Sequence, residues 1–130
     1  MHELSLWTES LTKEIVDIAF QLHKKLGPGL LESVYEKCFC YELERREIPF
    51  QRQCSVPIQY EELLIQDGLR LDVIVDDHII IELKALENYH PVWNAQLLSY
   101  MKLTQKEIGF LINFHTPLIK NGIKRLVLTS

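Results

Sequence analysis

The sequence is poor in residues that crosslink or anchor a chain. It has three cysteines in 130 residues, and this odd number comes with no sign of a secretory context. Cys38 and Cys40 lie two residues apart in an expected helix, so their side chains point about 200° apart and do not suit a shared zinc ion. We therefore expect a cytoplasmic protein with reduced thiols.

Long apolar segments are also missing. No apolar run of 18 residues occurs, and the first residues, Met-His-Glu-Leu-Ser-Leu-Trp-Thr-Glu, do not resemble a signal peptide. We expect no membrane partner. Because 47% of the 130 residues are hydrophobic and no repeat or long linker is visible, we expect a single domain over residues 1–130.

Positive charge is scarce. Fourteen Lys and Arg residues face eighteen Asp and Glu residues, which gives a net charge of −4. Proteins that coat nucleic acid rely on clustered Lys and Arg, and here a solvated surface is the simplest explanation of each small basic group. These groups are Arg45 with Arg46, Arg52 with Arg70, and Lys120 with Lys124 and Arg125. The acidic balance favours a catalytic or partner-assisted encounter over tight general binding.

Apolar spacing and turn residues predict an alternation of helices and strands. A Gln66-Asp67-Gly68 turn is expected before the second strand, and Pro57 places the first strand at a sheet edge or bulge. The order ααβββαββ predicts a layered α/β domain with a mixed sheet. The expected helices cover about 8–25, 30–46 and 91–103, and the expected strands cover 54–60, 69–75, 79–84, 108–114 and 123–128.

The most informative stretch covers residues 69–84 and carries three charged groups on expected strands. Two runs rich in Val and Ile flank Asp76-Asp77-His78, which predicts a hairpin. A charge on such buried strands is costly unless it is paired or bound to metal. Because strand side chains alternate, Glu82 and Lys84 point the same way. A three-residue loop places Asp72 opposite Glu82, whereas a two-residue loop places the two acids on opposite faces.

Two carboxylates and one ammonium at one point suit metal-assisted chemistry on phosphate esters. Paired carboxylates can hold Mg²⁺ or Mn²⁺, which keep several waters and bind substrate phosphate. The metal acidifies a bound water, and a neighbouring lysine orients that water or stabilises the transition state. The simpler alternative is a salt bridge within the hairpin, in which Lys84 pairs with Glu82 or Asp72.

Two further polar pairs lie on expected helices. Glu32 and Tyr35, with Glu36 beside them, share one helix face, and so do Gln96 and Tyr100. Each pair also has an ordinary explanation. The tyrosines can be half-buried packing residues with polar tips, and Glu32 can be a first-turn acid favoured by the helix dipole.

Taken together, these motifs resemble the GxxExxY protein family, which is placed in the PD-(D/E)xK nuclease superfamily. The resemblance is carried by Gly29-Leu-Leu-Glu32-Ser-Val-Tyr35, then Asp72, then Glu82-Leu-Lys84, then Gln96-Leu-Leu-Ser-Tyr100. It covers nearly the whole chain. It implies a three-layer restriction-endonuclease-like fold, with a mixed central sheet flanked by helices and the site where the hairpin strands splay.

The resemblance also implies roles for individual residues. Asp72 and Glu82 match the two motif acids expected to bind the divalent metal, Mg²⁺ or Mn²⁺, and Lys84 matches the motif lysine. Glu32 resembles the additional helix-borne acid of the metal site. The motif proline before the first acid is replaced by Leu71, a departure that puts little in doubt. Gln96 and Tyr100 fit the Gln-x-x-x-Tyr motif, which lies near the site and the substrate strand.

The function implied is a divalent-metal-dependent nuclease acting on nucleic acid, with DNA as the expected substrate. The main alternative is a nuclease-fold module that binds nucleic acid or a partner protein without catalysis. A hydrolase of small phosphate esters is a third reading. A homodimer or larger complex is left open, and Trp7 and Trp93 are treated as exposed aromatics that stack on bases or, as we favour, pack against the protein.

Overall fold

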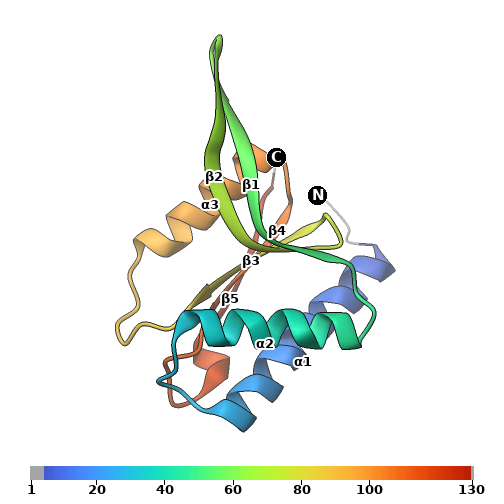
Figure 1. Cartoon of the computed structure of the whole chain (residues 1–130), viewed down its shortest axis with the longest axis vertical. Helices are drawn as coiled ribbons and strands as arrows, with labels where there is room; N and C mark the ends of the chain where they lie inside the picture. Colours follow the sequence, from blue (N-terminus) through green and yellow to red (C-terminus); the bar gives the residue numbers. More distant parts are fainter. Residues whose placement is uncertain (1–4, 130) are drawn as a thin grey trace.

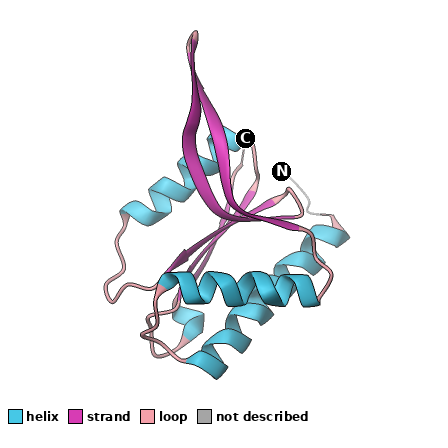
Figure 2. Ribbon diagram, viewed as in Figure 1, coloured by secondary structure: helices cyan, strands magenta, loops and turns pink. Residues whose placement is uncertain are grey.

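The computed structural model describes residues 5–129, which form a five-stranded sheet between helices (Figure 1; Figure 2). The predicted order ααβββαββ is confirmed. The single-domain prediction covers residues 1–130, of which residues 1–4 and 130 lie outside the described residues. The elements are α1 (Leu6–Leu26), α2 (Glu32–Arg45), β1 (Phe50–Tyr60), β2 (Leu63–Val75), β3 (Ile79–Lys84), α3 (Val92–Thr104), β4 (Ile108–Asn113), the short 3₁₀ helix η1 (Ile119–Asn121) and β5 (Ile123–Val127).

The sheet is mixed, with the strands in the order β1-β2-β3-β4-β5. Only β3 and β4 run parallel, and the other neighbours are antiparallel. A parallel pair needs a crossover connection, and α3 supplies it between β3 and β4. β1 is an edge strand with a register shift between Val56 and Ile58, so both expectations for Pro57 are met.

Helices cover both faces of the sheet and make three layers (Figure 1). Apolar residues of α1 and α2 pack with alternate residues of the central strands, including Ile79, Ile81 and Leu83. The other face, including Ile80, packs against α3. A strand covered on both sides reads as a continuous apolar run, which explains β3 and β4. Among residues 5–129, no helix combines the length and apolarity that crossing a bilayer would need.

The Gly-Pro-Gly connection between α1 and α2 is fixed to the body of the protein by Tyr35. Gly27 ends α1 with a φ of 71°, in the left-handed region that favours glycine. The Tyr35 hydroxyl donates to the Gly27 carbonyl oxygen at 2.5 Å and accepts from the Leu30 N–H at 3.2 Å. Its ring stacks on Phe114 with centroids 4.3 Å apart. These contacts fix the start of α2, where Glu32 lies.

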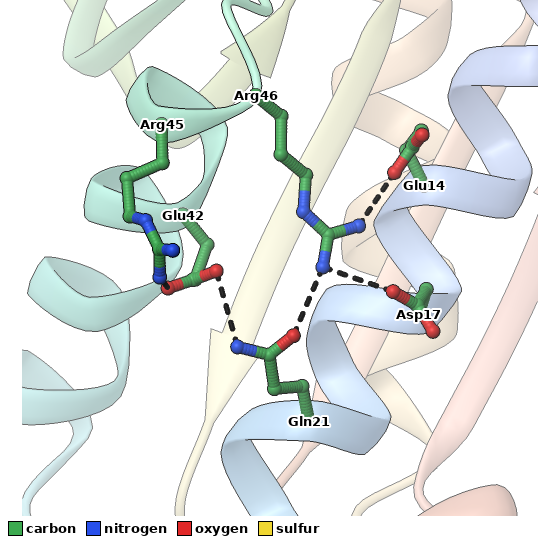
Figure 3. A network of polar contacts seen from close by, with 6 residues as sticks. All are labelled: Glu14, Asp17, Gln21, Glu42, Arg45 and Arg46. Atoms are coloured by element: carbon green, nitrogen blue, oxygen red, sulfur yellow. Dashed lines mark hydrogen bonds and ion pairs between the residues drawn. The ribbon is translucent and has the colours of Figure 1, made fainter.

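One basic residue at the end of α2, Arg46, joins this helix to α1 (Figure 3). Arg46 is half-buried and contacts Glu14 at 2.5 Å and Asp17 at 2.9 Å, whereas Arg45 pairs with Glu42 at 3.1 Å. Arg45 is solvated as expected, with 58% of its side chain exposed, whereas Arg46 belongs to an ion-pair network between the helices. Both arginines therefore form ion pairs with carboxylates of the same chain.

The predicted turn at 66–68 is wrong, because β2 continues through it and the turn lies at Glu61 and Glu62. Gly68 is needed for close strand approach. A Cβ there would lie 2.5 Å from the Ile58 side chain, beside the bulge in β1. Asp67 accepts a hydrogen bond from the Ser55 hydroxyl across the pair. The longer β1–β2 hairpin projects from the body as an arm (Figure 2).

Candidate active site

The loop between β2 and β3 sets which side chains face one another. It contains three residues, 76–78, and the flanking pairs run from Val75–Ile79 to Val73–Ile81. The predicted odd loop is therefore confirmed. The next residues along the two strands are Asp72 and Glu82, which face each other as the parity argument requires.

The backbone hydrogen bonds between β2 and β3 end at this pair, and hydrogen bonds from the backbone to the two carboxylates replace them. The Asp72 carboxylate accepts a hydrogen bond from the Leu83 N–H at 3.0 Å. The Glu82 carboxylate accepts one from the Asp72 N–H at 3.4 Å. The strands then separate, because β2 follows β1 into the arm while β3 stays with β4 (Figure 1). The two acids lie where the strands splay.

Burial raises the pKa of both acids. Only 6% of Glu82 is exposed, and burial, followed by the charge of Asp72, raises its pKa to about 8. Burial is also the main cause that raises the pKa of Asp72. Near neutral pH the pair therefore holds a proton unless a cation compensates it. Two oxygen-donor carboxylates that repel each other are a donor set that fits a hard divalent cation.

The third expected acid, Glu32, lies at the rim of this pair. Its side chain is exposed, and its pKa is raised by partial burial of the carboxylate and then by the charge of Asp72. Within residues 5–129, no three Asp, Glu, His or Cys side chains are close enough to form a ready metal site. A ligand role for Glu32 stays a prediction.

Sequence reasoning assigned no role to Glu36, although it lies one helical turn after Glu32. Glu36 is buried, and its carboxylate accepts hydrogen bonds at 2.6 Å from Arg52 Nε and from Gln53 Nε2. Its charge contributes to the raised pKa of Asp72. The i, i+4 spacing from Glu32 could have indicated this role, because it places both acids on one face of α2.

Lys84 forms no ion pair with Asp72 or Glu82 among the described residues, so the simple hairpin salt bridge is not present. Its ammonium lies 5.5 Å from the centroid of the Trp93 ring, within the range of a cation–π contact. Trp93 itself is only 8% exposed, so its description as an exposed aromatic is wrong. It packs, as favoured, and Trp7 remains exposed while donating to Asp76.

Tyr100 and Gln96 differ in their relation to the acids. Tyr100 is half-buried, and its pKa is raised by burial and then by the charges of Glu82 and Asp72. The Tyr100 hydroxyl on α3 therefore lies near enough to the acid pair to be affected by its charge. Gln96 lies one turn earlier, is exposed, and makes no hydrogen bond to Lys84 within the described chain. Its expected contact with Lys84 or with substrate stays a prediction.

Asn113 holds the segment that follows Lys84. It is buried on β4 and pairs in register with Lys84 on β3. Its amide donates to the Leu86 carbonyl oxygen at 2.9 Å, and its side-chain oxygen accepts from the N–H groups of Leu86 and His115, each at 3.2 Å. No sequence pattern singles out Asn113, because its contacts depend on tertiary structure.

Replacing Asn113 with alanine is expected to lower the free energy of unfolding by about 1–3 kcal/mol, because three part-buried hydrogen bonds to the backbone are lost. Chemical denaturation measures this directly. The matched control is Asn121→Ala, since Asn121 is exposed and its side chain makes no hydrogen bond in the described structure. The control should change stability by less than about 0.5 kcal/mol. Equal effects in both variants would show that the Asn113 contacts are unimportant.

The family comparison agrees with this geometry. A model of the PD-(D/E)XK nuclease superfamily matches residues 9–126. The chain belongs to this superfamily. No curated protein and no solved structure matches it. The mixed sheet with helices on both faces is the restriction-endonuclease-like fold expected of a PD-(D/E)XK protein. The match does not distinguish the GxxExxY group, so that finer assignment stays a prediction.

Proposed function

We propose that this PD-(D/E)XK protein, one domain of the GxxExxY type, is a divalent-metal-dependent nuclease that hydrolyses phosphodiester bonds of nucleic acid, with DNA as the expected substrate. One observation carries the proposal. Asp72, which is half-buried, and Glu82, which is buried, form a carboxylate pair where β2 and β3 separate, and Lys84 lies on the same strand face without an ion pair. A purely structural acid pair would be better compensated by its neighbouring lysine.

The donor atoms assign a role to each residue. Asp72 and Glu82 would hold Mg²⁺ or Mn²⁺, with Glu32 at the rim as an added acid. When bound, the cation supplies an acidified water and neutralises charge on the phosphoryl group. The Lys84 ammonium, which rests against an aromatic ring and not a carboxylate, is available to donate to the attacking water or to a phosphate oxygen.

Two residues of α3 would act on the substrate side. Tyr100 lies within the electrostatic influence of the acids and would donate a hydrogen bond from its hydroxyl to a phosphate oxygen. Gln96 is exposed one turn earlier and would contact the substrate strand or steady Lys84. Water would attack phosphorus in line with the leaving oxygen. The new bond joins water oxygen to phosphorus as that water loses a proton to solvent, and the bond to the leaving oxygen breaks as this oxygen takes up a proton from solvent.

A second function, binding of a partner protein without catalysis, is favoured by the ion pairs that the arginines form. Arg52 pairs with Glu36 at 2.6 Å and Arg125 with Glu9 at 3.4 Å, so few arginines remain for a phosphate backbone. Such a module, acting as a homodimer or inside a larger complex, would not need Mg²⁺ at the acid pair. Calorimetric titration with Mg²⁺ separates the two functions.

Replacement of Lys84 is the first test of activity. Labelled single- and double-stranded DNA is incubated with the protein and Mg²⁺, Mn²⁺ or EDTA. Cleavage should require metal, and Lys84→Ala should lower its rate about 10²–10³-fold, because one preorganised donor is lost. Lys102→Ala, an exposed lysine at the end of α3, is the control and should cleave normally. Normal cleavage by Lys84→Ala would contradict the assignment.

A further inference from the structure

A row of paired residues leads across the sheet from the acid pair to β5. Glu82 on β3 pairs with Leu111 on β4, which pairs with Lys124 on β5. Directly paired residues place their side chains on the same face of a sheet. Because neighbouring strands lie about 4.7–4.9 Å apart, Lys124 lies two strand spacings from Glu82 on the same face.

Two aromatic rings connect Lys124, at the far end of this row, with Lys84, which lies two residues after Glu82 on β3. Lys84 Nζ lies 5.5 Å from the Trp93 ring centroid, and the Trp93 and Tyr89 centroids are 5.4 Å apart in an edge-to-face arrangement. Lys124 Nζ lies 5.6 Å from the Tyr89 centroid. Trp93 is buried, whereas Tyr89 is 42% exposed, so part of the outer ring is accessible to a ligand.

Tyr89 and Lys124 also line a cavity of about 330 Å³ between the segment after β3 and the β4–β5 connection. Glu87 and His115 contribute polar groups to its wall. A phosphate inside the cavity would meet the Glu87 carboxylate, which disfavours it. A nucleobase such as adenine instead offers an exocyclic amino group to that carboxylate and a flat face to the tyrosine.

We propose that this cavity holds one unstacked base of a single-stranded nucleic acid beside the cleavage site. Tyr89 stacks on the base, and the flexible Lys124 side chain moves from the ring to the adjoining phosphate. Bases of a duplex are already stacked and paired, so the cavity selects single strands. The inference rests on the proposed function, because it names the substrate class of the same site.

Binding without metal tests this site separately from catalysis. Affinity for a fluorescent oligodeoxyadenosine strand is measured by anisotropy in EDTA. Tyr89→Ala should weaken binding about 5- to 150-fold, the range that corresponds to one stacked base, and Tyr89→Phe should bind like the parent. Tyr60→Ala is the matched control, because Tyr60 is an exposed tyrosine on the projecting arm, and it should bind like the parent.

A spectroscopic signal locates the base. In a Trp7→Phe background Trp93 is the single tryptophan of the chain, and a base on Tyr89 should quench its fluorescence. A strand of abasic sites keeps the phosphates but should bind more weakly and give no quenching. Equal binding of the abasic strand, or equally tight binding of duplex, would overturn the inference.

The outcomes for the base site and for catalysis can be told apart. Tyr89-dependent binding and quenching without any metal-dependent cleavage would support the base site and sink the nuclease assignment. Cleavage by a protein whose Tyr89→Ala variant binds and quenches like the parent would overturn the base site and leave the nuclease assignment intact.

Discussion

Replacing Glu82 with glutamine or alanine is expected to abolish metal-dependent cleavage, with a loss of at least about 10³-fold, while the protein stays folded. The carboxylate faces Asp72 at the end of the β2–β3 ladder, and its charge is what a divalent cation would compensate. Removing a preorganised charged group from a reaction site has effects of this size. Cleavage rates are compared at saturating Mg²⁺, with circular dichroism as the check on folding.

A buried glutamate elsewhere controls for this change. Glu42 on α2 is also buried, but its carboxylate pairs with Arg45 and accepts from Gln21, far along the chain from the hairpin. Glu42→Gln should cost stability and leave the cleavage rate per folded molecule unchanged. If Glu82→Gln cleaved as fast as Glu42→Gln, the acid pair would not be the reaction site.

The hairpin could be predicted from the sequence because its geometry is discrete. Strand side chains repeat every two residues, so the parity of the 76–78 loop alone decides whether Asp72 and Glu82 share a face. The apolar runs on either side of the loop identify the end of β2 and the whole of β3 as buried strands. The order of elements and the mixed sheet followed from the same local signals.

The arm could not be predicted, because its glycine has a tertiary role. Asp67-Gly68 is a typical turn dipeptide, yet Gly68 lies inside β2, where the Ile58 side chain leaves no room for a Cβ. The turn itself has Glu61 at a φ of 53° and contains no glycine or asparagine. Local turn preferences predict a turn five residues away from the real one, because the packing of Gly68 against the bulge cannot be read from the local sequence.

The residues that surround the two acids could not be predicted from the sequence either. Glu36 reaches the site only because α2 packs over the sheet, and its partner Arg52 comes from β1. The sequence predicts either a metal-site role or a salt bridge for Lys84. In the structure its ammonium lies against the Trp93 ring of α3. Periodicity assigns a residue to a face, whereas these contacts depend on how three separate elements pack.

The metal-free protein is expected to lose stability as the pH rises from about 5 to above 8. Glu82 has a pKa of about 8 in the folded protein, against an ordinary value of 4.5. Below 4.5 both states are protonated; between the two values the folded state binds more protons, so the free energy of unfolding falls with pH. The raised pKa of Asp72 acts in the same direction. The total loss is up to about 4 kcal/mol, and denaturation in EDTA across this range measures it.

The same variants identify the source of this pH dependence. Glu82→Gln cannot ionise, so its curve should be flatter and its stability at pH 9 should exceed that of the parent. Glu42→Gln should keep the parental slope. A flat curve for the parent protein would mean that Glu82 ionises as an ordinary surface carboxylate, and the case for a strained acid pair would fail.

Mg²⁺ connects this titration to the proposed function. A ligand that binds only the folded state stabilises it according to its affinity, and a cation held by both acids needs them ionised. The stabilisation by Mg²⁺ should therefore grow with pH between about 5 and 8, as the cation replaces the proton of the pair. A stabilisation that stays constant over this range would place the bound ion elsewhere on the protein, even if cleavage required it.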